Sequence, residues 1–256
     1  MPSAHRSSTE LAERLGARAA SCTVVSARPI CVSLHEVVLH GDPRLAGVPG
    51  NDVMVRVRHD GHHVRRRYTV RSVDYDNHRF SIWVSTDHVG AGSTWAQSAA
   101  AGNAVDVIGP RGKITLAESA DWHLFIGDVS GLAAFYRLAQ SIETPGRAIF
   151  IVEIDQDDDA LTADFDEGLG VTGIFVDRRE RSRNDPAGLL SGLSAFAFPP
   201  DQGHAYVLGE FSVVRAVRDA LRDRGLRDQD ISHKAYWRLG RANADHGEPD
   251  KADVAQ

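Results

Sequence analysis

The stretch Arg65-Arg66-Arg67-Tyr68-Thr69-Val70-Arg71 brings guanidinium groups, an aromatic ring and a hydroxyl together within one short segment. Its pattern is that of a β-strand, where successive side chains point to opposite faces, so Arg66 and Tyr68 share one face. A ring beside fixed cations suits a flat ligand that carries phosphates, because arginine grips the anion with two hydrogen bonds. A solvated basic strand with one half-buried tyrosine explains the same residues.

The residues on both sides of this stretch also alternate with a period of two. Residues 53–58 alternate valine with longer side chains, and Asp60-Gly61 then predicts a hairpin turn. Further strands are expected over 22–25, 32–39, 64–73 and 80–84, with a break at Pro29 and turns at Gly41-Asp42-Pro43 and Asp76-Asn77. Short strands at this spacing predict a small antiparallel β-barrel.

A glycine-rich segment follows the last of these strands. Gly90, Gly92, Ser93 and Thr94 precede an alanine-rich run, which predicts the beginning of a helix. The free N–H groups and the dipole of such a helix end can bind phosphate. An ordinary Ser/Thr cap on a surface helix is the alternative.

The pattern changes near 118–121, where we place a domain boundary. Apolar strands are expected over 122–126, 148–154, 172–176 and 205–208, and helices over 132–142, 185–193 and 212–224. Alternating strands and helices predict a parallel sheet, which binds nucleotides at the carboxyl ends of its strands. The expected organisation is an N-terminal extension (1–20), a barrel domain (21–118), an α/β domain (119–241) and a polar tail (242–256).

Composition narrows the range of functions. The net charge of −6 argues against nucleic acid as a partner and favours a small anionic ligand at the local basic cluster. Cys22 and Cys31 fit neither a zinc site nor a disulfide scaffold. The acidic run at 155–159 is expected to be a solvated loop, so we predict no metal site. We find no apolar span of membrane length and no signal peptide, and expect a cytoplasmic protein.

The first turn of the α/β half, residues 127–134, contains Asp128 and Ser130 but no complete G-x-G-x-x-G fingerprint. Taken alone, the turn is better explained as an ordinary strand-to-helix turn. The arginines at 178, 179, 181 and 183 follow a later strand and could favour the 2′-phosphate of NADPH over NADH, although a surface loop is an equal alternative.

Several motifs together resemble the siderophore-interacting proteins, which are ferric-siderophore reductases of the ferredoxin-reductase-like class. These motifs are Arg66-x-Tyr68-Thr69-x-Arg71, the glycine-rich turn ending in Trp95-Ala96, Gly109-Pro110-Arg111-Gly112, Leu208-Gly209-Glu210 and Ala235-Tyr236-Trp237-Arg238-Leu239-Gly240. The resemblance implies an FAD-binding barrel followed by an NAD(P)-binding α/β domain.

The resemblance also implies roles for single residues. Tyr68 would pack by the isoalloxazine, Thr69 would bond near its N5, and Arg66 would meet the diphosphate. The remaining cofactor-binding positions implied are Arg71, Gly90, Gly92, Ser93, Thr94, Asp128, Ser130, Tyr236 and Trp237. Thr69 and Glu210 would tune the reaction, while Arg71 and Lys234 would attract an anionic substrate.

Two departures from the family pattern stand out. Ser85 and Thr86 occupy the place of a His-Gly pair, and the turn carries Val129, Gly131 and Ala133 where the family has an acid, alanine and proline. We therefore expect a reductase that passes electrons from NADPH or NADH through FAD to a ferric siderophore. The alternative is a non-redox isomerase or cyclase on a flavin-binding scaffold. A simple electron-transfer partner is disfavoured, because the chain lacks the cysteines of an iron–sulfur cluster. The sequence does not fix the oligomeric state.

Overall fold

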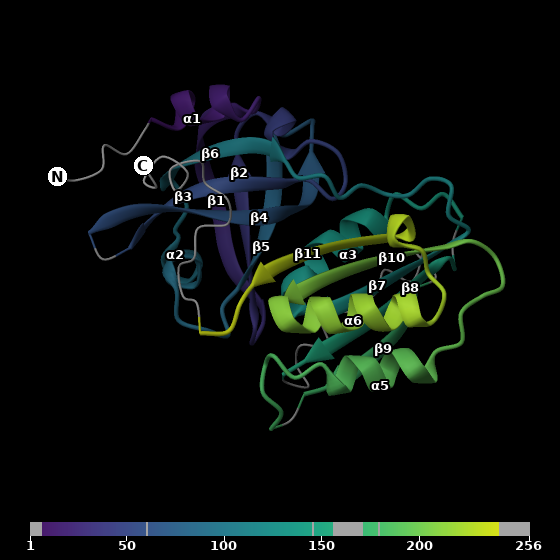
Figure 1. Cartoon of the computed structure of the whole chain (residues 1–256). Coiled ribbons are helices and arrows are strands. Elements are labelled where there is room, and N and C mark those ends of the chain that lie inside the picture. The colour runs from purple at the N-terminus through teal and green to yellow at the C-terminus, as the bar shows by residue number, and fades with distance from the viewer. Residues whose placement is uncertain (1–6, 60, 145, 156–170, 179, 241–256) are drawn as a thin grey trace, which may run out of the picture.

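The structure is a computed structural model that describes residues 7–59, 61–144, 146–155, 171–178 and 180–240. It contains a closed antiparallel barrel with strand order β1-β2-β5-β4-β3-β6 and a parallel sheet with order β11-β10-β7-β8-β9 (Figure 1). Both halves of the predicted fold class are therefore confirmed. The described residues contain no helix long and apolar enough to cross a membrane.

Six strands form the barrel. They are β1 Arg18–Cys31, β2 Leu34–His40, β3 Asp52–His59, β4 His62–Asp74, β5 Arg79–Ser85 and β6 Ala104–Arg111. Val53, Val55 and Val57 point into the core, as their alternation predicts, and pack with Phe80 and Ile82. The expected meander of three strands corresponds to β3, β4 and β5.

One expectation for the N-terminal region was wrong. Strand β1 continues through Pro29, which pairs with His35, and the hairpin turn lies at Val32-Ser33 instead. Proline is tolerated here because β6 pairs with β1 only over Arg18–Thr23, so Pro29 lies on a free edge.

The segment expected to be an extension is part of the barrel. Helix α1 (Ser8–Arg14) is fixed at its start by a capping box between Ser7 and Glu10. Its buried residue Leu11 packs on Met54 and Ile108, two outward-facing side chains of the barrel. The helix therefore covers apolar surface that the barrel would otherwise expose to water.

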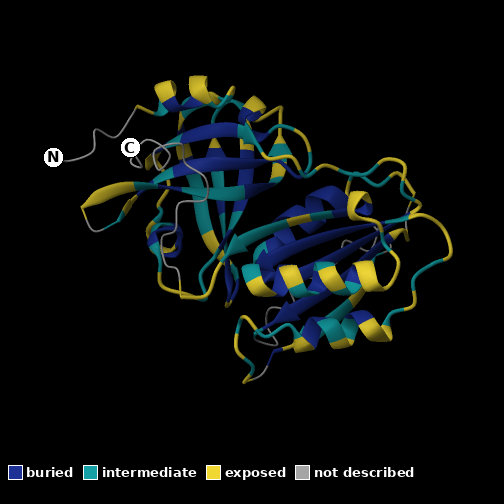
Figure 2. Cartoon of the chain, viewed as in Figure 1, coloured by how far each residue is buried: buried dark blue, intermediate teal, exposed yellow. Residues whose placement is uncertain are grey.

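The α/β half is a sheet covered on both faces. Its strands are β7 Trp122–Asp128, β8 Ala148–Ile154, β9 Thr172–Asp177, β10 Gly203–Glu210 and β11 Ile231–Trp237. Helix α3 (Leu132–Ala139) lies on one face, and α5 (Ala187–Ala195) and α6 (Phe211–Asp223) lie on the other (Figure 1). Strands β7 and β8 are buried throughout, as two-sided covering requires (Figure 2).

The order of the strands fixes where a ligand can bind. From one edge of the sheet to the other the strands are β9, β8, β7, β10 and β11. The chain therefore extends the sheet from β7 first in one direction, through β8 and β9, and then in the other, through β10 and β11. The crevice at the carboxyl ends of β7 and β10 is the switch point where nucleotides bind such sheets. Strand β11, not expected from the sequence as a strand, closes this edge of the sheet beside β10.

Helix α3 joins the two domains. Arg137 is 7% exposed and donates hydrogen bonds to the carbonyls of Ala46, Gly47 and Val70 in the barrel. Burial lowers the pKa of Arg137 to about 10, which still leaves it charged at neutral pH. Apolar residues of the barrel, including Leu34, share one cluster with α3. The shared core fixes the pocket between the domains.

Candidate functional site

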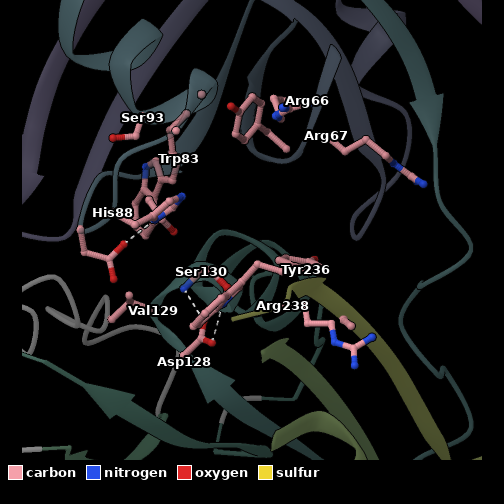
Figure 3. Close-up of a pocket in the computed structure, with 18 of the residues that line it drawn as sticks. Arg66, Arg67, Trp83, His88, Ser93, Asp128, Val129, Ser130, Tyr236 and Arg238 are labelled. Atoms are coloured by element: carbon pink, nitrogen blue, oxygen red, sulfur yellow. Dashed lines mark hydrogen bonds and ion pairs between the residues drawn. The ribbon is translucent and has the colours of Figure 1, made fainter. Parts of the chain in front are cut away.

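A cavity of about 560 Å³ lies between the barrel and the carboxyl edge of the sheet. Figure 3 shows Arg66, Trp83 and Ser93 on the barrel side, with Asp128, Ser130 and Tyr236 on the sheet side. The residues predicted from two separate halves of the sequence therefore face a single pocket.

Strand β4 reaches the pocket through a gap in the barrel wall. Its ladder with β5 covers Val70 to Asp74, whereas residues 66–69 pair with β3. Arg66, Arg67, Tyr68 and Thr69 consequently all line the cavity, although the strand alternation had placed them on opposite faces. The parting of β4 from β5 explains why both faces are accessible.

Tyr68 forms a flat wall next to helix α2 (Ala91–Ser98). Its ring stacks on Trp95, with centroids 6.3 Å apart, and burial raises its pKa. A Cβ atom at Gly92 would lie 1.9 Å from the Tyr68 hydroxyl, so the helix backbone approaches the ring as only glycine permits.

The first turn of α2 and Arg66 both lie near the Tyr68 ring. Gly90, Gly92 and Ser93 line the cavity, and Ser93 is buried. Thr94 differs from expectation: it is exposed and does not line the pocket. Free helix N–H groups facing an arginine provide two kinds of donor for one phosphate-bearing ligand.

Thr69 and Tyr236 join the two domains inside the pocket. Their hydroxyl oxygens are 2.7 Å apart. Burial raises the pKa of Tyr236, so its phenol stays protonated at neutral pH. The pair was not predicted, because the two residues are far apart in sequence.

A cluster of charged groups lies beside this pair. The carboxylate of Asp52, which is 2% exposed, accepts two hydrogen bonds from Arg67 and one from Lys234 Nζ at 2.6 Å. Burial lowers the pKa of Lys234, and the charge of Asp52 opposes that effect. With two cations and one carboxylate, the cluster has a positive charge at the pocket wall.

Asp128 holds the strand-to-helix turn and the closing strand together. Its carboxylate accepts hydrogen bonds from the backbone and hydroxyl of Ser130, from Glu210 N and from Trp237 Nε1 at 3.0 Å. Burial raises the pKa of Asp128, while these donors favour its charged form. Asp128, Ser130, Tyr236 and Trp237 all line the pocket, as expected.

Glu210 does not have the position expected of a residue that tunes the reaction. It is 1% exposed, does not line the pocket and caps helix α6 by accepting from Ser212 N and Val213 N. It also accepts from Leu239 N. The Gly-Glu motif therefore ends a strand, begins a helix and holds the last described segment in place.

Arg71 also lies outside the pocket. Its guanidinium lies over the rings of Trp83 and Tyr136, which contact each other, at 5.1 and 5.0 Å from their centroids. It donates to Gln140 Oε1 on the segment after α3. Arg71 is thus a contact between domains, and its expected roles in cofactor and substrate binding are corrected.

The loop after β5 contributes residues that the sequence analysis missed. Asp87 and His88 line the pocket, and His88 Nδ1 lies 2.9 Å from Asp87 Oδ1. Arg183 of the α/β domain pairs with Asp87 across the pocket. Ser85 lines the cavity, while the Thr86 hydroxyl bonds to His35 instead. The departure from the family pattern at Ser85 and Thr86 was the sequence feature that could have drawn attention to this loop.

Part of the arginine run also reaches the pocket. Arg178 and Arg183 line it, and both are paired with carboxylates: Arg178 with Glu153 at 2.9 Å and Arg183 with Asp155 at 3.1 Å. Arg179 lies outside the described residues. Among these described residues we found no cluster of side chains that could hold a metal, and most of the acidic run expected to be a loop, 156–159, is likewise outside them.

A barrel followed by a five-stranded parallel sheet is the fold of the ferredoxin-reductase-like class. A solved ferredoxin-NADP⁺ reductase from Neisseria gonorrhoeae with bound FAD and NADP has the same fold, with a TM-score of 0.69 over 86% of this chain and 99% of that one at 13% identity. The pocket also fits FAD on its own geometry, with a glycine-lined aromatic wall next to an arginine and a helix end.

The chain belongs to the siderophore-interacting protein family. Residues 42–114 match the siderophore-interacting FAD-binding domain, and residues 120–240 match the siderophore-interacting protein domain. A solved siderophore utilization protein from T. fusca is 26% identical, with a TM-score of 0.74 over 90% of this chain and 96% of that one.

Among curated proteins, the ferric vibriobactin reductase ViuB of Vibrio cholerae is 28% identical over 185 residues. The match covers 70% of this chain and 66% of that protein, just under two thirds of its length. The resemblance expected from the motifs is therefore confirmed.

Proposed function

We propose that this protein is a flavin-dependent reductase that passes electrons from NAD(P)H through FAD to a ferric siderophore or a similar ferric chelate. The observation that carries the proposal is one pocket that combines a phosphate-binding end, a flat aromatic wall and the nucleotide-binding crevice of the sheet. The match to ferric vibriobactin reductase supports the same reaction class.

The barrel side of the pocket supplies the FAD site in this proposal. Arg66 and the first turn of α2 hold the diphosphate, Tyr68 packs against the isoalloxazine, and Thr69 lies beside N5. FAD supplies the chemistry that the side chains lack, because it takes two electrons from a nicotinamide and releases them singly. The protein orients the two cofactors and excludes water from between them.

The sheet side supplies the nicotinamide site. The turn that Asp128 and Ser130 hold provides the backbone surface, and Trp237 closes it. Arg178 and Arg183 face the pocket but are already paired with carboxylates, so NADPH and NADH both remain donors in this proposal. Both donors are abundant in the cytoplasm, the compartment we propose for the protein.

The positive cluster at Asp52 attracts the ferric chelate. Lys234 and Arg67 share one carboxylate, so a positive charge remains to meet a small anionic substrate. Arg71 has no part in this site. The turn at 127–134 is hydrogen-bonded in spite of its substitutions, and no observation favours the non-redox alternative.

Anaerobic mixing tests the proposal. Purified protein with bound FAD is mixed with NADPH or NADH while the flavin absorbance is followed. We expect bleaching with at least one nucleotide, and recovery of the yellow colour when a ferric catecholate is added. A flavin that stays oxidised with both nucleotides would exclude the reductase and return attention to the non-redox alternative.

A further inference from the structure

A hydrogen bond between two hydroxyl groups crosses the pocket wall from one domain to the other. Thr69 Oγ1 on β4 and Tyr236 Oη on β11 are 2.7 Å apart, and either oxygen can be the donor. Both residues line the pocket, and Thr69 is 5% exposed. Water cannot readily replace the partner of the buried Thr69 hydroxyl, whereas Tyr236 is only partly buried and lines the pocket, so its proton can meet water there.

The pair has two arrangements of its protons. Burial raises the pKa of Tyr236, so the phenol keeps its proton at neutral pH. When Tyr236 donates to Thr69, the threonine proton is free to be donated into the pocket. When Thr69 donates to Tyr236, the threonine lone pairs are free to accept, and the phenol O–H turns to its other in-plane orientation.

We propose that Tyr236 is a positioning residue that allows Thr69 to bond to N5 of FAD in both redox states. The inference rests on the proposed function, which puts Thr69 beside N5. With FAD bound, Thr69 would donate to N5 while that nitrogen has a lone pair, and would accept from it once it carries an N–H group. The exchange needs only rotation of two hydroxyl protons.

The role of the Tyr236 hydroxyl can be tested separately from the role of its ring. Lys234 Nζ lies 5.2 Å from the ring centroid, and this contact does not depend on the phenol oxygen. Asp52, Arg67 and Asp128 are the other charged groups that act on the phenol. Tyr236→Phe keeps the ring and all these neighbours, and removes only the partner of Thr69.

The midpoint potential of bound FAD is the decisive measurement. In Tyr236→Phe the oxidised state loses only a donor to a Thr69 lone pair, whereas in the reduced state the buried Thr69 proton has no acceptor, so the reduced state loses more stability. We expect unchanged FAD content and a reduced form disfavoured about tenfold, which lowers the potential by about 30 mV for a two-electron couple. Dithionite titration against a reference dye measures this without NAD(P)H or a ferric chelate.

Because the dithionite titration uses neither NAD(P)H nor a ferric chelate, failure of the reductase proposal and failure of this inference give different results. A protein that binds FAD but is not reduced by nucleotides can still show the potential shift.

Three further variants serve as controls. Tyr206→Phe removes another buried phenol, which accepts from Ala117 N outside the pocket, and should leave the potential unchanged. In a Thr69→Ala background, Tyr236→Phe should cause no additional shift, because Tyr236 acts through Thr69. An unchanged potential in Tyr236→Phe, or an equal shift in both backgrounds, would overturn the inference.

If Tyr236→Phe does not fold, the midpoint potentials of two Thr69 variants test the inference instead. Thr69→Ser keeps the hydroxyl and should keep the wild-type potential, whereas Thr69→Val should lower it. Equal potentials in these two variants would exclude a role for the hydroxyl pair.

Discussion

Arg66 lines the pocket near the Tyr68 ring, and we propose that it binds the diphosphate of FAD. We expect Arg66→Ala to yield colourless protein, because the charged donors that hold a diphosphate are reduced to backbone N–H groups. The flavin absorbance per mole of purified protein measures the loss. Arg79→Ala is the control and should retain normal colour. It removes an exposed guanidinium at the beginning of β5, whereas the other end of this strand, Ser85, lines the pocket. Full flavin content in Arg66→Ala would refute the role of this side chain.

The sequence could place residues that act near one another along the chain. Arg66, Tyr68 and Thr69 belong to one motif, and a strand of known direction brings them to the pocket together. Arg71 was assigned wrongly because its partners, Trp83 and Tyr136, come from another strand and another domain. Asp87 was not predicted for the same reason, because its partner Arg183 is distant in the sequence.

At the scale of elements, the contact between α2 and the Tyr68 ring depends on Gly92. A Cβ atom at Gly92 would lie 1.9 Å from the Tyr68 hydroxyl, so Gly92→Ala must displace the ring or the helix. We expect FAD affinity to fall about tenfold or more, because either displacement changes the distance between the aromatic wall and the helix end. Equilibrium dialysis or flavin fluorescence can measure the affinity.

Gly90→Ala provides a matched control for this substitution. Its Cβ atom would meet only the His88 ring, at 3.6 Å or more, which is an ordinary contact distance. Its φ of −175° is also accessible to alanine. Because Gly90 also lines the pocket, we expect some loss of FAD affinity but a smaller one than in Gly92→Ala, and equal losses in both variants would contradict the role given to Gly92.

Strand β7 buries a histidine whose protonation opposes folding. Burial lowers the pKa of His123 to about 4, with a contribution from His204, whereas the unfolded value is about 6.5. The unfolded chain takes up a proton first as the pH falls, so His123 costs no stability at pH 7 and destabilises the fold between about pH 6.5 and 4.

We therefore expect the free energy of unfolding to fall by about 1 kcal/mol between pH 6.5 and pH 5 on account of His123. Urea denaturation at each pH measures this change. His123→Leu should reduce the pH dependence. A His123→Leu variant with the full wild-type dependence would assign the effect to other groups.

Periodicity predicted most of the described elements, since alternation in the barrel and apolar runs in the sheet both follow from what each face buries. The errors occurred where pairing decides the outcome. Pro29 stays within β1 because its neighbouring edge has no partner strand. Helix α1 folds onto the barrel because Met54 and Ile108 face outward, which alternation alone cannot reveal.

At the scale of the whole molecule, Arg137 is the main polar connection between the domains. Arg137→Met keeps an apolar stem but leaves the carbonyls of Ala46, Gly47 and Val70 without this donor. We expect a loss of about 3 kcal/mol in the free energy of unfolding, measured by urea denaturation. Arg147→Met, at a partly exposed position, should change stability little. Equal stability of both variants would contradict the role of Arg137.

The pocket as a whole could not be predicted from either half of the sequence. Each domain has its own local pattern, but the relative position of the domains depends on α3, the shared apolar cluster and the two arginines 71 and 137. These contacts join residues far apart in the chain, and no local periodicity encodes them.

The contacts of Arg137 also limit how early the interface between the two domains can form during synthesis on the ribosome. The barrel carbonyls it binds lie up to 91 residues upstream, so the barrel leaves the ribosome well before α3 does. Until α3 arrives, water must satisfy those carbonyls. Closing so long a segment of chain is costly in entropy, which makes docking of α3 a late step in folding. The cleft for the cofactors is therefore completed only after both domains have been synthesised.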